Sequence, residues 1–203
     1  YIYMIYGYNI LNTFLNQGAF KIAKFLEEKK FIAVPVPASP PADYMKLMGV
    51  FSNRHGAVAS GLGNFGWQSV LLTPQFGPRL RLASVITNAE IEEDPLFTET
   101  LCKGEKCMIC AEVCPVKAIP LKDAVELEIG GSHYRYSKID KWRCRIAEQG
   151  LTKLTLGYTE FDGLGEVNGE VYLEQLKKEN PWQRLERQGS YCGQCIIHCP
   201  VGL

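Results

Sequence analysis

Apolar residues along the first thirty positions recur at the three- and four-residue steps of an amphipathic helix. We predict this helix over residues 9–30. A short apolar run over residues 31–36 predicts a strand. The proline-rich stretch 35–43 predicts an extended loop, because proline fixes φ and lacks a backbone N–H. The apolar face of the predicted helix consists of Leu11, Phe14, Leu15, Ile22, Phe25 and Leu26.

Helix and strand patterns continue to alternate as far as about residue 90. The pattern predicts a helix over residues 44–60, a glycine-rich segment at 61–66, and strands at 69–73 and 82–87. Such alternation is typical of α/β architecture. We therefore expect an α/β domain in the first half of the chain.

The character of the sequence changes after Pro95, where long apolar runs stop and cysteines begin. We therefore place a boundary between a domain of residues 1–97 and a domain of residues 98–203. The elements predicted in the second domain are a β-hairpin over 124–137 turning at Gly130-Gly131, a short helix over 138–149, a glycine-rich loop over 157–169 and a helix over 170–188.

Composition and charge narrow the function classes. The chain has 203 residues, 46% of them hydrophobic, with 22 basic and 22 acidic residues and a formal net charge of zero. This balance gives no electrostatic reason to expect non-specific binding to nucleic acid or membranes. No apolar run approaches the length of a membrane span and no signal peptide is visible, so we expect a cytoplasmic protein. Since the chain begins at Tyr1 without an initiator Met, the sequence leaves open an export signal upstream.

Eight cysteines carry the strongest chemical signal. One run reads C-M-I-C-A-E-V-C-P-V and the other C-G-Q-C-I-I-H-C-P-V, so both share the pattern C-x2-C-x3-C-P-V and form a degenerate repeat. Disulfides suit small domains without a core, whereas these cysteines are bunched at the spacing of metal ligands. The eight are Cys102, Cys107, Cys110, Cys114, Cys144, Cys192, Cys195 and Cys199.

The spacing favours iron. In bacterial ferredoxins the cysteine that precedes proline ligates the other of two clusters. Eight thiolates divide into two sets of four with none left over, so we predict two [4Fe–4S] clusters. The resemblance to two-cluster ferredoxins covers residues 100–202 and implies crosswise ligation. One cluster would take Cys102, Cys107, Cys110 and Cys199, and the other Cys114, Cys144, Cys192 and Cys195.

Two other metal sites stay open. Pairs of C-x2-C also build tetrahedral zinc sites, although zinc does not require the C-x3-C-P pattern. The spacing of Cys102, Cys107 and Cys110 also matches the plant-type [2Fe–2S] pattern. That alternative leaves Cys114 and the second run unexplained. The four-residue gap after Cys102 makes this cysteine the least secure ligand.

Another motif lies in the first half of the chain. Arg54 stands seven residues before a G-L-G-N-F-G-W segment, and V-L-L follows at residues 70–72. Together with the cysteine pattern, this motif resembles epoxyqueuosine reductases and, more distantly, reductive dehalogenases, over about residues 9–202. The resemblance implies an α+β chain, in which a nitroreductase-like, corrinoid-binding α/β domain, incomplete at its N-terminus, precedes a bacterial ferredoxin-like domain. The residues that it implies for cobalamin binding are Arg54, Gly61, Leu62, Gly63, Gly66 and Trp67.

The alternative for the glycine-rich segment is a tight turn without a ligand, because it precedes a predicted strand and so lacks the dinucleotide-binding context. The family has a lysine where this chain has Trp67, and its acidic proton donor would fall at Leu47. Candidate catalytic residues are instead Asp43, Tyr44 and His55, of which a histidine can act as an acid near neutral pH.

These features predict an oxidoreductase that passes electrons through two [4Fe–4S] clusters to a corrinoid, which reduces a small organic substrate. The expected partner is a redox donor of ferredoxin or flavodoxin type. A tRNA substrate is not expected, because the helical-repeat tRNA-binding tail of epoxyqueuosine reductase is missing. The alternative is an electron-transfer module without its own active site.

Metal analysis tests the iron assignment. Anaerobically purified protein should be brown and contain about eight irons per chain, four for each [4Fe–4S] cluster. A colourless protein that contains about two zinc ions per chain, one for each tetrahedral site, would contradict it.

Overall fold

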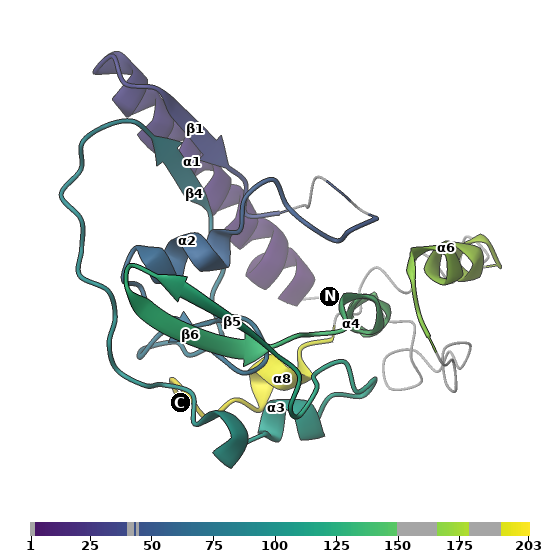
Figure 1. The fold of residues 1–203 in the computed structure, drawn as a ribbon. Helices are drawn as coiled ribbons and strands as arrows, with labels where there is room; N and C mark the ends of the chain where they lie inside the picture. Colours follow the sequence, from purple (N-terminus) through teal and green to yellow (C-terminus); the bar gives the residue numbers. More distant parts are fainter. Residues whose placement is uncertain (1–2, 40–42, 44, 150–165, 179–191) are drawn as a thin grey trace.

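The computed structural model describes residues 3–39, 43, 45–149, 166–178 and 192–203 (Figure 1). None of the helices in these ranges combines the length and apolar character needed to span a bilayer. The helices are η1 (Tyr3–Asn9), α1 (Ile10–Glu28), α2 (Asn53–Ala59), η2 (Gly104–Lys106), α3 (Ile109–Glu112), α4 (Lys141–Glu148), α6 (Gly169–Lys178) and α8 (Gln194–Ile197). The strands are β1 (Ala33–Val36), β2 (Asn64–Phe65), β3 (Leu71–Leu72), β4 (Ser84–Thr87), β5 (Ala124–Ile129) and β6 (Ser132–Ser137).

The described strands form three antiparallel pairs, β1 with β4, β2 with β3, and β5 with β6. The chain is thus a mixed α+β protein, as predicted. The parallel sheet that is typical of alternating helices and strands is not present among these strands. The short connections explain the difference, because β2 and β3 are joined by a tight turn rather than by a crossover helix.

The predicted first helix is confirmed as α1, but it buries a different face. α1 packs along β1 and β4 (Figure 1). It buries Ala19 and Ala23, whose small side chains allow a close approach to the strands, while Phe14, Ile22 and Phe25 of the predicted apolar face are exposed. The sequence pattern was therefore right about the helix and wrong about its buried face.

The predicted helix over 44–60 is shorter than expected. Only Asn53–Ala59 is helical, and Asp43 and Met48 instead form an isolated β-bridge. The Asp43 carboxylate accepts hydrogen bonds from the backbone N–H groups of Met45 and Lys46. An aspartate that bonds nearby backbone in this way favours a turn over a helix.

The predicted hairpin is confirmed with its turn. β5 and β6 pair in register from Ala124 with Ser137 to Ile129 with Ser132. Gly130 and Gly131 both have positive φ, of 55° and 78°. A two-residue hairpin turn needs this conformation, and glycine adopts it without steric cost.

The other expected elements of the second half are partly described. The helix over 138–149 is confirmed as α4, and Asp140 caps it by accepting the backbone N–H of Arg143. The helix expected over 170–188 is α6 as far as Lys178, and its remainder lies outside the described residues. Most of the loop expected over 157–169 also lies outside them.

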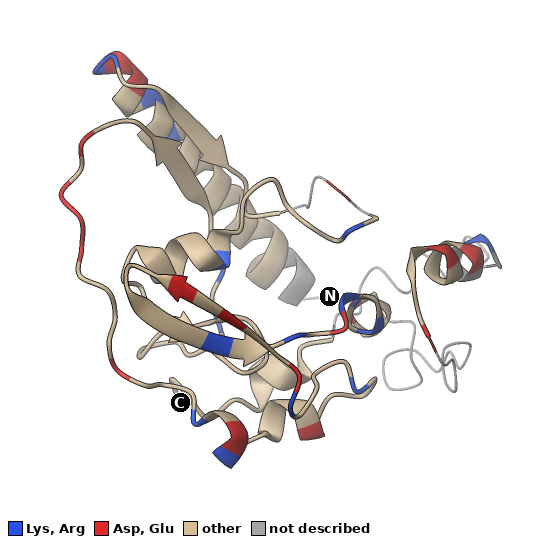
Figure 2. Cartoon of the chain, in the orientation of Figure 1, with Lys and Arg blue, Asp and Glu red and all other residues tan. Residues whose placement is uncertain are grey.

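A hydrophobic core joins the two halves of the chain. It contains Val58, Phe65 and Leu71 from the first half and Tyr136 from the hairpin. Residues 88–103 connect the halves as a segment without helix or strand, bent at residues 89 and 99, along which acidic residues follow one another (Figure 2). The predicted boundary at residue 97 falls inside this segment and stays a prediction, but the residues on its two sides share one core.

A pair of glycine substitutions tests the packing of β3. A Cβ on Gly63 would lie 2.0 Å from the Leu72 carbonyl oxygen, whereas a Cβ on Gly18 meets nothing within 4 Å. We expect Gly63→Ala to lower the free energy of unfolding by about 1–3 kcal/mol through overpacking. Gly18→Ala lies within α1 and should raise it by about 0.5–1 kcal/mol. Urea unfolding followed by circular dichroism measures both, and equal effects would contradict the packing described for Gly63.

Candidate metal centre

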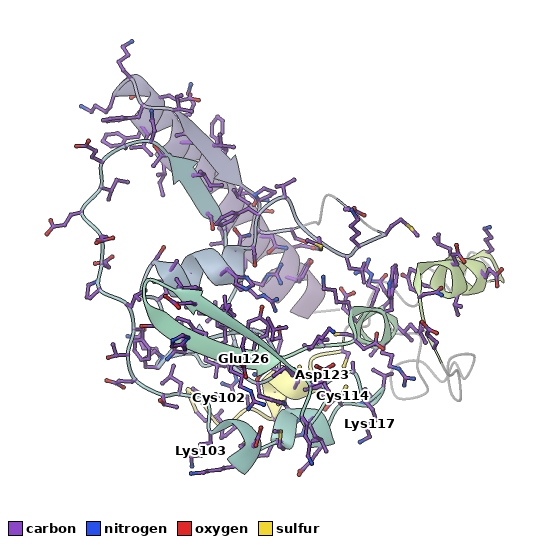
Figure 3. All side chains as sticks on the ribbon, in the orientation of Figure 1. Cys102, Lys103, Cys114, Lys117, Asp123 and Glu126 are labelled. Atoms are coloured by element: carbon purple, nitrogen blue, oxygen red, sulfur yellow. The ribbon has the colours of Figure 1, made fainter. Side chains whose placement is uncertain are left out.

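Two short helices bring the cysteine runs together. α3 carries Cys110 and α8 carries Cys195, and the two helices pack side by side (Figure 1). Cys102 and Cys114 lie near these helices, beneath the β5–β6 hairpin (Figure 3). All eight cysteines are free thiols. Thiols that are distant in sequence therefore meet in one part of the molecule.

The first set of thiols surrounds Cys110. Burial, and after it the nearby thiolates of Cys102, Cys107 and Cys199, raise the pKa of Cys110 to about 11. Cys110 and Cys199 are buried, and the other two are half-buried. The first set thus combines Cys102, Cys107 and Cys110 with Cys199, the last cysteine of the second run.

The second set contains Cys114, Cys144, Cys192 and Cys195. Burial raises the pKa of Cys144 to about 12, with Cys114 and Cys192 as the next causes. Burial also raises the pKa of Cys195 to about 12, followed by the thiolates of Cys144 and Cys192. Solvent still reaches the Cys144 sulfur, because this thiol opens into a cavity while protein surrounds it on its other sides. Bringing four such thiols to the thiolate state requires a compensating positive charge.

In the described ranges, no three His, Cys, Asp or Glu side chains converge where a single metal ion could bind. A zinc ion draws each sulfur ligand to about 2.3 Å. A [4Fe–4S] cluster instead distributes four thiolates over four irons, so the donor type and number fit two such clusters.

Backbone N–H groups point at the cysteine sulfurs. Cys102, the least secure ligand by sequence spacing, accepts from Trp67 N–H at 3.3 Å and from Gly104 N–H at 3.4 Å. Cys114 accepts from Ala118 N–H at 3.2 Å. Hydrogen bonds of this kind stabilise thiolate and raise the reduction potential of a bound cluster.

Trp67 lies against the cysteines. It is buried in a core cluster with Cys110 and Cys114, and its indole N–H donates to the Pro120 carbonyl oxygen at 2.9 Å. Arg135 lies over the ring, 5.2 Å from its centre. Trp67 therefore packs against cysteines of both sets, and it lies outside the two cavities that Arg54 lines.

The glycines of segment 61–66 have internal reasons to be glycine. A Cβ on Gly61 would lie 2.3 Å from the Pro95 carbonyl oxygen, and one on Gly66 would lie 2.5 Å from Gln68 Oε1. Leu62 between them is exposed. These contacts support the tight-turn alternative for the segment, and its contact with a corrinoid stays a prediction.

Arg54 occupies a central position. Its guanidinium donates to the backbone oxygen and the hydroxyl of Ser69, and lies 5.0 Å from the centre of the Tyr136 ring. Burial lowers the pKa of Arg54. No carboxylate of the described residues pairs with it. A partly buried guanidinium without an acidic partner carries a desolvation cost that a bound anion would offset.

His55 is held from both sides. Its Nδ1 lies 2.6 Å from the Ser52 hydroxyl and its Nε2 lies 3.0 Å from the Tyr136 hydroxyl. Burial and then the charge of Arg54 lower the pKa of His55 below 6.5. The imidazole is therefore neutral at pH 7, and it shares one hydrogen bond with a phenol that can donate a proton.

The other two catalytic candidates are placed differently. Asp43 is half-buried, and its hydrogen bond from the Lys46 backbone lowers its pKa, so this carboxylate is ionised and occupied by its turn. Tyr44 lies outside the described residues. Sequence reasoning did not assign Tyr136 to the site, although this phenol contacts both Arg54 and His55. The sequence shows only that Tyr136 ends a run of aromatic and basic residues at 133–136 within the predicted hairpin.

Two adjoining cavities lie beside these residues and share Leu47, Arg54 and Lys141. One, the His55 cavity, has a volume of about 570 Å³. Its other lining residues include Arg81, several apolar side chains, and Ile196, which follows Cys195 in the chain. Such a volume is that of a small-molecule site.

The other, the Cys144 cavity, has a volume of about 500 Å³ and is lined by Tyr136, Ser137 and Cys144. The second set of thiols therefore opens into the cavity on which Arg54 lies. Of the six residues implied for corrinoid binding, only Arg54 lines either cavity. Metal bound by these thiols would lie next to a basic cavity to which it can pass electrons. The His55 and Tyr136 side chains beside this cavity carry a proton between them.

Comparison with known proteins identifies the class. No protein-family model matches the chain. It is 33% identical over 185 residues to the tetrachloroethene reductive dehalogenase of Dehalobacter restrictus, covering 89% of this chain and 26% of that protein. It is 41% identical over 145 residues to the enzyme of the same name from Sulfurospirillum multivorans, covering 71% of this chain and 22% of that protein.

Solved structures show the same fold. Epoxyqueuosine reductase from Streptococcus thermophilus matches with a TM-score of 0.51 and 19% identity, over 90% of this chain and 37% of that one. A selenomethionine-labelled epoxyqueuosine reductase matches with a TM-score of 0.54 and 21% identity, over 94% and 39%.

The fold and the two thiol sets thus define a cysteine-rich segment related to oxidoreductases. The chain is homologous to part of the tetrachloroethene reductive dehalogenases and shares its fold with part of epoxyqueuosine reductase. The predicted resemblance is confirmed. The chain spans about a quarter of the length of these dehalogenases.

Proposed function

We propose that the eight thiolates hold two [4Fe–4S] clusters in the crosswise sets described above. Three observations support this proposal: the thiols group in fours, N–H groups point at Cys102 and Cys114, and no disulfide joins any pair. The chain then serves as an iron–sulfur oxidoreductase that passes electrons to a corrinoid, which reduces a small organic substrate. An organohalide is the substrate class indicated by the names of the homologous dehalogenases.

The main observation behind this proposed function is that Cys144 and Arg54 line the same cavity. When bound, the clusters supply single electrons and a corrinoid supplies a cobalt that accepts them. The His55 cavity combines apolar side chains with the basic groups of Arg54, Arg81 and Lys141. Arg54 offers positive charge to an anionic group in either cavity.

The chain's own residues also hold a proton near the cavities. The Ser52 hydroxyl fixes the orientation of the His55 ring through Nδ1, which leaves Nε2 directed at the Tyr136 hydroxyl. Tyr136 lines the Cys144 cavity and His55 lines the cavity next to it, so this pair lies between the two. Proton supply by a positioned phenol or imidazole is a common device in reductive chemistry.

A redox protein of ferredoxin or flavodoxin type is the proposed electron donor. Cys102 of the first set lines a separate cavity of about 400 Å³ with Trp67 and Arg135. The first set is therefore reached from a side of the protein other than the His55 cavity. Electrons entering here pass the second set before they reach the Cys144 cavity.

The second candidate is an electron-transfer module without its own active site. The internal packing of Gly61, Gly63 and Gly66 and the occupied carboxylate of Asp43 favour it. Incubation of the anaerobic protein with cobalamin separates the two candidates. Retention of a cobalt spectrum that changes on reduction supports the enzyme, and no retention supports the module.

Paired cysteine substitutions test the crosswise sets. Cys102→Ala and Cys199→Ala should each remove the same cluster, so the double variant should lose no more iron than either single variant. Cys102→Ala combined with Cys114→Ala should lose both clusters. Iron analysis and electron paramagnetic resonance of anaerobic protein measure the result, with about four of the eight irons expected to remain in each single variant.

If each cluster were instead bound by cysteines that are neighbours in the sequence, Cys102 and Cys114 would belong to one cluster. The iron losses of the two double variants would then be exchanged. If the Cys102 and Cys114 double variant kept as much iron as the single variants, the crosswise assignment would be wrong. Loss of all iron in every single variant would likewise contradict two independent sets.

A further inference from the structure

A buried hydroxyl in the wall of the Cys144 cavity has no partner. Ser137 is fully buried, and its Oγ makes no hydrogen bond. Its backbone N–H is satisfied by the Trp67 carbonyl oxygen at 3.0 Å. Buried hydroxyls are almost always hydrogen-bonded, and leaving one unpaired costs about 1–3 kcal/mol. The cavity that Ser137 lines is the place from which a partner can come.

The guanidinium of Arg54 on the same cavity also lacks a charged partner. It contacts only neutral groups, the oxygens of Ser69 and the ring of Tyr136. Ser69 is only two residues beyond Trp67, whose carbonyl oxygen binds the Ser137 backbone. The unpaired hydroxyl and the uncompensated cation therefore belong to neighbouring segments of one wall.

The charge around this space is strongly biased. Arg54, Lys138, Lys141 and Arg145 line the Cys144 cavity, and Glu148 is its single acidic residue. Glu148 already pairs with Arg145 at 2.5 Å. The His55 cavity next to it adds Arg81 and contributes no Asp or Glu. A chain of zero net charge thus gathers at one place three cations, Arg54, Lys138 and Lys141, that form no ion pair with an acidic side chain of the described residues.

We propose that the Cys144 cavity is a binding site for a phosphate-type anion, held by the Arg54 guanidinium, the Ser137 hydroxyl and the ammonium groups of Lys138 and Lys141. Guanidinium and hydroxyl donors together match the oxygens of a phosphate. A tetrahedral anion would give Ser137 an acceptor and Arg54 a counter-charge at once. No bond is made or broken in this binding.

Two sources supply this chemistry. One is the phosphodiester of the corrinoid's nucleotide tail, and the other is a phosphate group on a free ligand. The role of the site in catalysis rests on the proposed function. The anion site itself does not, because it consists of residues of this chain and can be titrated without a corrinoid.

Calorimetric titration of the anaerobic, cluster-loaded chain with inorganic phosphate tests the site. We expect saturable one-to-one binding at fixed ionic strength. Arg54→Gln should weaken it about tenfold or more, as expected for a lost charge-assisted hydrogen bond. Ser137→Ala should also weaken phosphate binding. It should leave the unfolding temperature unchanged, because it removes an oxygen that is unpaired in the free protein.

Arg135→Gln is the matched control. Arg135 is on the same strand as Ser137 but outside the cavity, and it already pairs with Glu105 and Glu126. This variant should bind phosphate as the unchanged chain does. Equal weakening by all three variants, or no saturable binding, overturns the site. An altered cluster potential in Arg54→Gln with unchanged phosphate affinity also overturns it, since Arg54 would then only balance the charge of the cluster.

Competition identifies the source. Cobalamin carries the phosphodiester, and cobinamide lacks it. Displacement of phosphate by cobalamin but not by cobinamide supports the corrinoid tail as the occupant. Phosphate binding that neither corrinoid displaces supports a free phosphate ligand, and it leaves the site intact even where the corrinoid part of the proposed function fails.

Discussion

The burial of neighbouring thiols, reinforced by repulsion between their thiolates, is the constraint on which this structure depends. Cys110, Cys144 and Cys195 have pKa values raised to about 11 or 12, first by burial and then by neighbouring thiolates. Such sets can ionise together only around a positive centre, which iron provides. α3, α8 and Trp67 are arranged around this requirement, with N–H groups directed at sulfur and apolar side chains filling the space between.

The β5–β6 hairpin links this centre to the rest of the molecule. Tyr136 joins the core formed by Val58, Phe65 and Leu71, and its hydroxyl contacts His55. Ser137, the next residue, binds the Trp67 backbone and faces the Cys144 cavity. One strand therefore connects the packing of the first half, the tryptophan that packs against both thiol sets and the wall of the basic cavity.

The relation to the dehalogenases extends over most of this chain. The match to the Dehalobacter restrictus enzyme covers 89% of the chain, which spans about a quarter of the length of those enzymes. Epoxyqueuosine reductase shares the fold at 19–21% identity. Likeness at this level of identity shows a shared fold, and proteins of one fold differ in function through the residues of their sites.

The sequence by itself determined the features that depend on near neighbours. The C-x2-C-x3-C-P spacing indicated a metal centre, Gly130-Gly131 located the hairpin turn, and the period of residues 9–30 predicted α1. Only the tertiary structure decided which face of α1 is buried and that Tyr136 reaches His55 across 81 positions. The reason is physical: local spacing and periodicity record short-range backbone geometry, whereas contacts between distant segments depend on how whole surfaces pack, and no single segment carries that information.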